Sequence, residues 1–240
     1  QVLRKLYMQN NNLEKGFSLV ELAIIMVVMG LLSVAVIGGQ SLINSGKMGK
    51  LASEIQTIRQ AVNGFRSVYS AAPGDLKNAT SYFGSSNLAN GDGDGIIAQG
   101  DNDTADEVNN AMVHLSRSGL IETTALANNG TKFVSLRSYP GELYLSSNKD
   151  DDGADVSGFT YASGTHNFII AAASGYGYNA VVKPLVAYNV DKKLDDSFPR
   201  TGNATYIVAG DVSDASCTNS TTEYYLTSNT VACNMSFQID

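Results

Sequence analysis

The residues from Phe17 to Gly39 form one apolar segment, FSLVELAIIMVVMGLLSVAVIGG, which holds a single charged side chain, Glu21. As a helix rising 1.5 Å per residue, this segment would extend about 35 Å, enough to cross the hydrocarbon core of a bilayer. Arg4, Lys5 and Lys15 precede it, and the positive-inside tendency then places its N-terminal end in the cytoplasm. We therefore predict one transmembrane helix, with the rest of the chain outside the cytoplasm.

Glu21 lies near the start of this segment, where a carboxylate costs about 2.5–3.5 kcal/mol on membrane-insertion scales. A secretory signal peptide is one alternative, with Ser33-Val34-Ala35 as a weak cleavage site, but its apolar core is ordinarily only about 7–15 residues long. A plain single-pass anchor is another alternative, and it leaves the carboxylate unexplained. Because an intramembrane carboxylate needs a cationic partner, Glu21 is a candidate functional residue.

The hexapeptide Gly16-Phe17-Ser18-Leu19-Val20-Glu21 resembles the prepilin cleavage and methylation motif of type IV pilins and type II secretion pseudopilins. The resemblance includes a short charged leader before the glycine, and it covers about residues 8 to 75. It implies that a prepilin peptidase cuts after Gly16 and that Phe17 becomes the N-methylated terminus. It also implies that Glu21 pairs with the terminal amine of a neighbouring subunit during assembly. Met8 would give a nine-residue leader, and residues 1–7 are either part of it or not native.

The same resemblance implies a structural subunit of a type IV pilus or pilus-like filament, built from copies of this chain or from other pilins. Its further partners would be the prepilin peptidase, an inner-membrane assembly platform and, before assembly, the lipid bilayer. It would lie first in the bacterial inner membrane and then in a cell-surface or periplasmic filament. Two alternatives stay open, a type II secretion pseudopilin and a membrane-tethered extracellular binding module that depends on calcium and never polymerises.

Helical periodicity continues beyond the apolar segment. Apolar residues recur at spacings of three and four, which predicts one buried stripe along a helix: Met48, Leu51, Ile55, Ile58, Val62, Phe65 and Tyr69. Pro73-Gly74 predicts its end. We divide the chain into a leader (1–16), a transmembrane or filament-core helix (17–45), an amphipathic half of that helix (46–71) and an extracellular β-rich globular head (72–240).

The head alternates short apolar runs with clusters of glycine, serine, asparagine and aspartate. Period-two alternation predicts a hairpin from 133–139 and 142–146 around Pro140-Gly141. Further predicted strands are 158–162, 167–173, 205–209 and, at an edge, 223–226. Predicted helices are 106–120 and 184–194. The expected fold class is α+β and pilin-like, with a long N-terminal helix, transmembrane in its first half, packed against an antiparallel sheet.

The glycine-rich loop at residues 90–101 nearly fits the EF-hand calcium loop, with Gly95 at its sixth position and oxygen-bearing groups at the ligand positions. Its candidate ligands are Asn90, Asp92, Asp94, Ile96 (through its carbonyl) and Asp101. The aspartate at position 12 has a shorter arm than the usual glutamate, and no EF-hand helix is evident before the loop. A solvated turn is the alternative. No cofactor is required for a structural role, and calcium is the ligand that this pattern raises.

A second acidic loop offers Asp150, Asp152 and Asp155 as weaker calcium candidates, and it lacks a closing acid. The two cysteines, Cys217 and Cys233, favour one disulfide in an extracytoplasmic domain over two reduced core thiols. The family resemblance includes such a C-terminal disulfide loop. A loop of this size stabilises the fold by about 3 kcal/mol in the chain-entropy model.

Nothing in the sequence predicts an enzyme. The chain lacks G-x-S-x-G, H-E-x-x-H and P-loop motifs, and His114 and His166 stand in no nucleophile pattern. After Glu21 the chain carries 13 basic and 21 acidic side chains, a net charge of −8. Such a surface argues against nucleic acid as a partner, because that binding relies on positive charge.

Overall fold

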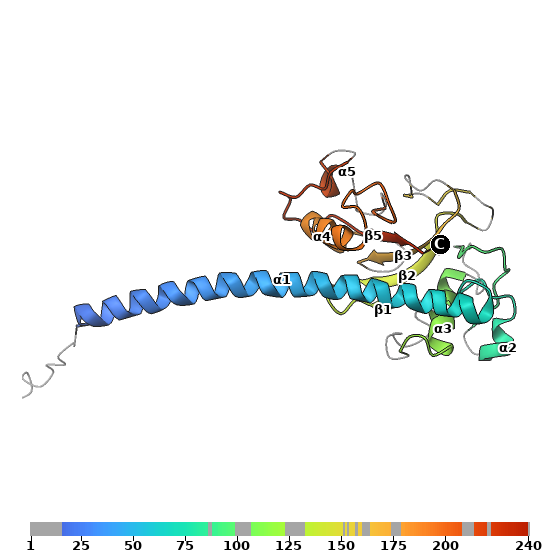
Figure 1. Ribbon diagram of the computed structural model, residues 1–240, viewed down its shortest axis with the longest axis horizontal. Helices are drawn as coiled ribbons and strands as arrows, with labels where there is room; N and C mark the ends of the chain where they lie inside the picture. The colour runs from blue at the N-terminus through green and yellow to red at the C-terminus, as the bar shows by residue number, and fades with distance from the viewer. Residues whose placement is uncertain are drawn as a thin grey trace, which may run out of the picture. The chain divides into compact units, whose positions relative to one another are not determined.

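The computed structural model is shown in Figure 1. It describes residues 16–85, 88–98, 107–122, 133–150, 152, 154–156, 158–159, 164–173, 179–207, 214–219 and 222–239. The chain divides into two compact units, Gln1–Ser45 and Gly46–Asp240. The first helix, α1, spans Leu19–Tyr69 and therefore contributes to both.

In the first unit α1 exposes nearly all of its apolar side chains. Leu19 is 84% exposed and Leu42 is 75% exposed. Among the described residues, α1 is the helix that is long and apolar enough to cross a membrane, with a mean hydropathy of 2.7 in its most apolar stretch. Because the described residues of this unit leave the surface uncovered, lipid or other protein chains are natural partners to bury it.

In the second unit one face of α1 is buried in the core, as the periodicity predicts. Five residues of the expected stripe are buried, namely Leu51, Ile55, Ile58, Val62 and Phe65. The polar face is used as well, since Arg59 Nη2 donates to the carbonyl of Gln238 at 3.0 Å and Arg66 Nη1 to that of Ile239 at 3.2 Å. This part of α1 is thereby joined to the C-terminal end of the chain.

The sheet has five antiparallel strands in the order β1-β2-β3-β5-β4 (Figure 1). The strands are β1 Val134–Ser135, β2 Glu142–Ser147, β3 Asn167–Ala172, β4 Ala204–Thr205 and β5 Met235–Gln238. In the register, Leu143 of β2 opposes Ala171, and Ile169 of β3 opposes Phe237. The side chains of Leu143, Ile169 and Phe237 are buried at the centre of the unit.

Four shorter helices complete the described fold: α2 Ala79–Phe83, α3 Glu107–Arg117, α4 Pro184–Leu194 and α5 Asp214–Cys217. Helices were predicted over 106–120 and 184–194, and α3 and α4 confirm both. The α+β fold class, with a long N-terminal helix and an antiparallel sheet, is confirmed.

Two predicted strands are cut short by side-chain hydrogen bonds that replace the ladder. After β1, the Arg137 N–H donates to Glu54 Oε1 at 3.2 Å and Ser138 Oγ to Glu54 Oε2 at 2.9 Å, which turns the chain towards α1. After β4, the Ile207 N–H donates to Asn234 Oδ1 at 2.8 Å instead of to a neighbouring strand. Residues 208–209 of that predicted strand lie outside the described residues.

The other strand predictions differ more. The edge strand expected at 223–226 is reduced to an isolated bridge between Thr218 and Tyr224. At 158–162 the described residues, 158–159, are not in a strand, and the remainder lies outside the described residues. The inner strand β5, between β3 and β4, was not predicted, although Met235 and Phe237 alternate with polar residues.

Candidate functional site

The described chain begins at Gly16, and α1 is capped by its own side chains. Ser18 Oγ accepts the Val20 N–H at 3.3 Å, and Glu21 Oε2 accepts the Ser18 N–H at 2.8 Å. This reciprocal pair is a capping box, which satisfies two of the N–H groups that a helix N-terminus leaves free. Sequence reasoning missed the box, although its S-x-x-E spacing is legible.

The peptide link proposed for cleavage is open to solvent. Gly16 and Phe17 lie before the first turn of α1, and the Phe17 side chain is 75% exposed. A Cβ atom at Gly16 would meet no other atom within 4 Å. An enzyme can therefore reach this link without unfolding any described element.

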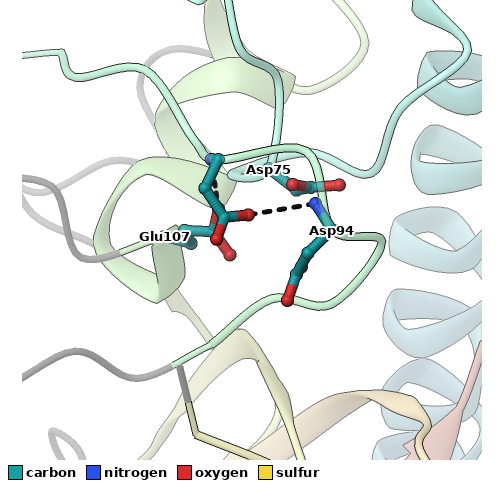
Figure 2. A group of neighbouring side chains, drawn as sticks. Asp75, Asp94 and Glu107 are labelled. Carbon is teal, nitrogen blue, oxygen red and sulfur yellow. Dashed lines mark hydrogen bonds between the residues drawn. The ribbon is translucent and has the colours of Figure 1, made fainter. Parts of the chain in front are cut away.

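In the head, four carboxylates from three segments converge on one point. One oxygen from each of Asp75, Asp92, Asp94 and Glu107 lies within 4.8 Å of all the others. Asp75 follows the end of α1, Asp92 and Asp94 belong to the glycine-rich loop, and Glu107 opens α3. Figure 2 shows three of them, Asp75, Asp94 and Glu107. We call these four residues the acidic cluster.

Backbone N–H groups hold the acidic cluster in place. Glu107 accepts two of them, from Asp92 on Oε1 and from Ala98 on Oε2, both at 3.1 Å. Asp75 Oδ2 accepts the Gly95 N–H at 3.1 Å. These bonds fix the glycine-rich loop against both the end of α1 and the start of α3.

Within the loop, each aspartate also shapes the backbone that follows it. Asp92 Oδ1 accepts the Asp94 N–H at 3.0 Å, and Asp94 Oδ1 accepts the Ile96 N–H at 2.9 Å. Such bonds from a side chain to the N–H two residues on are Asx turns. They use one oxygen of each aspartate and direct the chain around the cluster.

Two glycines permit the close approach of these segments. A Cβ atom at Gly91 would lie 2.4 Å from the backbone of Asp75, and one at Gly74 would lie 2.4 Å from the Glu107 carbonyl oxygen. Gly74 also has a φ of +97°, which disfavours residues with a side chain. Both positions therefore require glycine for the cluster to form.

His114 of α3 links the segment after α1 to the start of the glycine-rich loop. Its Nδ1 accepts the Gly74 N–H at 2.8 Å, and its Nε2 lies 3.4 Å from the Ala89 carbonyl oxygen. The ring is fully buried beside Phe65 and Phe83. Burial lowers the pKa of His114 to about 4, so the ring is neutral at physiological pH and acts as a structural linker.

The acidic cluster is electrostatically strained. The pKa of Asp75 is raised to about 6, chiefly by burial and also by the charges of Asp94 and Asp92, while the N–H groups of Gly95 and Gly93 oppose the shift. The pKa of Glu107 is raised to about 7, chiefly by burial and also by the charges of Asp75 and Asp92, while its two N–H donors oppose the shift. Concentrated negative charge in a partly desolvated place is what produces both shifts.

Positive charge lies near the cluster without pairing with it. Arg66 and Lys77 line an open depression of about 700 Å³ that Asp75 and Asp94 also line. The ion pairs among the described residues lie elsewhere, between Arg137 and Glu122 and between Lys149 and Asp155. The cluster thus has no cationic partner within 4 Å in the described part of the chain.

Only some of the calcium ligands predicted in the glycine-rich loop lie in the acidic cluster. Asp92 and Asp94 join the cluster, whereas Asn90 Oδ1 accepts the N–H of Thr80 at 2.9 Å and its hydroxyl at 3.1 Å. Ile96 lies at the loop's end with its N–H bound to Asp94. Asp101 lies outside the described residues. Sequence reasoning missed the other two members, because a single-loop pattern cannot include residues from neighbouring segments.

The described residues of the second acidic loop show no such convergence. Asp155 Oδ1 pairs with Lys149 Nζ at 2.5 Å, and Asp150 Oδ1 accepts the Ala154 N–H at 2.7 Å. Asp152 is exposed. The carboxylates of Asp150, Asp152 and Asp155 do not form a group of the kind seen in the acidic cluster.

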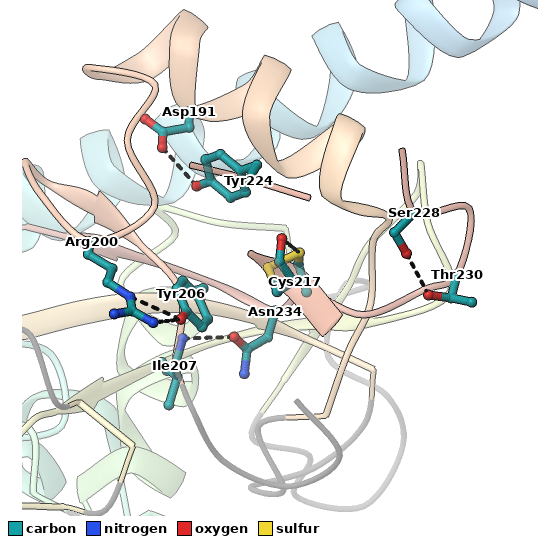
Figure 3. Close-up of a disulfide and its surroundings, with 10 residues drawn as sticks. Asp191, Arg200, Tyr206, Ile207, Cys217, Tyr224, Ser228, Thr230 and Asn234 are labelled. Atoms are coloured by element: carbon teal, nitrogen blue, oxygen red, sulfur yellow. Dashed lines mark hydrogen bonds between the residues drawn. A yellow bond between two sulfur atoms is a disulfide. The ribbon is translucent and has the colours of Figure 1, made fainter. Parts of the chain in front are cut away.

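A further carboxylate group, Asp191, Asp195 and Asp196, is satisfied by the fold. Asp191 accepts the Tyr224 hydroxyl at 2.8 Å (Figure 3). It also accepts the Ser197 N–H at 3.0 Å. Asp195 accepts the Asn203 and Ala204 N–H groups. Asp196 accepts the Phe198 N–H at 2.8 Å and the Thr201 hydroxyl at 2.6 Å. These acids organise the turn after α4.

Cys217 and Cys233 form a disulfide, as the sequence predicted (Figure 3). Both cysteines are fully buried. The carbonyl of Cys233 accepts the N–H groups of Val181 and Val182 at 2.8 and 2.9 Å. The bridge therefore fastens the loop between the two cysteines to the segment that leads into α4.

Comparison with known proteins gives one match. Residues 11–37 match a family model described as the prokaryotic N-terminal methylation motif, which is the prepilin-type motif of type IV pilins and pseudopilins. No curated protein and no solved structure matches the chain. The match ends within α1, and the residues from 38 onward are outside it.

Proposed function

Because the chain carries the prepilin-type methylation motif, we propose that it is a structural subunit of a type IV pilus or a pilus-like filament. The match of residues 11–37 carries this proposal. The apolar first part of α1 supports it, because its exposed side chains need neighbours of the kind that other helices provide in a filament core. The function is assembly, and no step of it requires catalysis by this chain.

In this proposal a prepilin peptidase removes the leader after Gly16 and Phe17 becomes the N-methylated terminus. The exposure of both residues supports access by the enzyme. The precursor is held in the inner membrane by α1, with its N-terminus in the cytoplasm and its head outside. An assembly platform in that membrane then adds it to a cell-surface or periplasmic filament.

Glu21 provides the contact that sets the register between subunits. One of its oxygens, Oε2, accepts the Ser18 N–H, and Oε1 has no hydrogen-bond partner among the described residues. The carboxylate is therefore oriented by its own helix and retains an oxygen for an incoming cation. The terminal amine of a neighbouring Phe17 is such a cation, and pairing would offset the cost of burying the acid among apolar helices.

The test separates the charge of Glu21 from its role in the cap. Glu21→Gln keeps an oxygen acceptor for the Ser18 N–H and removes the charge, whereas Ser18→Ala removes the hydroxyl of the cap and keeps the charge. We expect Glu21→Gln to lower incorporation into sheared filaments at least tenfold and Ser18→Ala to assemble near the wild-type level. Immunoblots of filament and membrane fractions measure this.

Normal assembly of Glu21→Gln, or equal loss in both variants, would contradict a role for the charge. The tethered binding module would then become the better description.

A secretion pseudopilin carries the same motif and is the second candidate. Deleting the gene distinguishes the two: a pilus subunit is needed for surface fibres, and a pseudopilin for export of secreted proteins.

A further inference from the structure

We propose that the head binds a calcium ion at the acidic cluster, with carboxylate ligands from Asp75, Asp92, Asp94 and Glu107. The ion would join the end of α1, the glycine-rich loop and the start of α3. The proposal does not depend on filament assembly, and its test uses no assembly readout.

A group of acids is common without a metal, and the evidence for a ligand here comes from Asp75. Its side chain is 2% exposed, and its Oδ1 is buried with no hydrogen-bond partner among the described residues. A buried carboxylate oxygen without a donor is costly, and proteins ordinarily satisfy it with a donor or a metal. Asp75 belongs to the group whose carboxylate oxygens converge, and a cation bound there would give this buried carboxylate the positive partner that it lacks.

The carboxylate group around Asp191 shows what a structural arrangement looks like in the same molecule. There, Asp191 is also buried, but both of its oxygens accept hydrogen bonds, from Tyr224 and from Ser197. Its two acidic neighbours likewise accept N–H groups of the turn. Asp75 differs from Asp191 in having one buried oxygen that the fold leaves unsatisfied.

The charge of the acidic cluster also calls for a cation. Four carboxylates meet within 4.8 Å, two of them buried, and no lysine or arginine of the described residues pairs with them. Arg66 is engaged with the Ile239 carbonyl, and Lys77 lines the adjoining depression without reaching the carboxylates. A divalent ion would neutralise this charge at the place where the oxygens converge.

The donor set favours calcium over other common metals. All four donors are hard oxygens, and neither cysteine is free to ligate. His114 directs its ring nitrogens to Gly74 and Ala89. Calcium accepts six to eight oxygens in flexible geometry, which suits carboxylates from three segments, whereas magnesium demands a near-ideal octahedron. The open depression beside Asp75 and Asp94 gives water access to complete the shell.

The variant Asp75→Asn tests the site most sharply. The asparagine oxygen can take the place of Oδ2 and accept the Gly95 N–H, and the amide nitrogen takes the place of the oxygen that has no donor. We therefore expect the full chain in detergent, treated with a chelator, to melt at or above the wild-type temperature when it carries this change. With calcium at 100-fold excess over Kd, the wild type should gain about 5–10 °C and the variant should gain little.

Calorimetric titration with calcium chloride measures the same site directly. We expect Kd to weaken at least tenfold in Asp75→Asn and in Asp94→Asn, whose side chain is exposed and whose bond to Ile96 asparagine can keep. Asp150→Asn, in the other acidic loop, and Asp191→Asn serve as matched controls and should bind like the wild type.

Three outcomes would overturn the proposal. The first is a wild-type chain that shows neither heat of binding nor a shift in melting temperature with calcium. The second is an Asp75→Asn chain that melts lower in chelator and keeps the full calcium shift, which is what a purely structural aspartate predicts. The third is an equal response to magnesium chloride, which would remove the assignment to calcium.

Discussion

At the scale of single residues, the molecule uses carboxylates in three different ways. Glu21 is exposed at the start of α1 and has one oxygen bound by its own backbone. Asp75 is buried with one oxygen unsatisfied, and Asp191 is buried with both satisfied. These environments are the basis of the proposed subunit contact of Glu21 and the proposed metal-ligand role of Asp75, and they make Asp191 a structural anchor.

Asp191 should give the head a measurable pH dependence. Burial raises its pKa to about 7, with Asp196 and Asp195 adding to the shift and the bonds from Tyr224 and Ser197 opposing it. A carboxyl whose pKa is higher in the folded than in the unfolded chain binds its proton first in the folded state. Its contribution to stability is therefore complete below about pH 4 and is lost as pH rises through about 7.

The variant Asp191→Asn removes this titration and can keep both contacts, by accepting from Ser197 and donating to the Tyr224 oxygen. Between pH 8 and pH 5, we expect the unfolding free energy of wild type relative to variant to rise by roughly 2 kcal/mol. Denaturant unfolding of the full chain in detergent with chelator, followed by tyrosine circular dichroism, measures it. Parallel pH curves for the two proteins would contradict the assignment.

Sequence reasoning reached some of these residues and not others, for a physical reason. Glu21 could be identified because a single charged residue inside an apolar run stands out from the residues next to it in the sequence. Asp92 and Asp94 could be identified because turn geometry links residues two apart. Asp75 and Glu107 could not, since only the packing of α1, the loop and α3 brings them together.

At the scale of elements, periodicity predicts helices better than strands in this chain. α4 begins and ends where the pattern places it, and α1 differs by one or two residues. β1 and β4 are shorter than expected because side chains of Glu54 and Asn234 take over backbone partners. These side-chain hydrogen bonds join residues that are distant in sequence, so a local sequence pattern cannot predict them.

At this scale the disulfide between Cys217 and Cys233 should contribute measurably to the stability of the fold. Replacing both Cys217 and Cys233 with serine releases the segment between them in the unfolded chain, and we expect a loss of about 3 kcal/mol. For a chain of this size that corresponds to a melting temperature lower by about 6–12 °C. Differential scanning calorimetry of the full chain in detergent provides the measurement.

Reductant provides the control for that comparison. The wild type should lose the same stability when its disulfide is reduced, and the double serine variant should be unaffected. A wild type and a variant that melt together under oxidising conditions would contradict a stabilising role for the bridge.

At the scale of the whole molecule, the chain combines two surfaces of opposite character. The first part of α1 exposes apolar side chains with one carboxylate, and the remainder from Lys47 onward carries a net charge of −8. Hydropathy averaged over the whole chain does not reveal this division, whereas the position of the apolar run does. The match to the prokaryotic N-terminal methylation motif lies at residues 11–37, in the apolar part of this division.

The most direct test of the central claim is the identity of the chain's terminus in its native cell envelope. Mass spectrometry of the purified chain should find a first residue of N-methylated Phe17, in both membrane and filament fractions. Loss of the peptidase should leave the leader attached. A chain that retains its leader in cells with an active prepilin peptidase, or one that begins after Ala35, would contradict the proposal that this protein is a processed filament subunit.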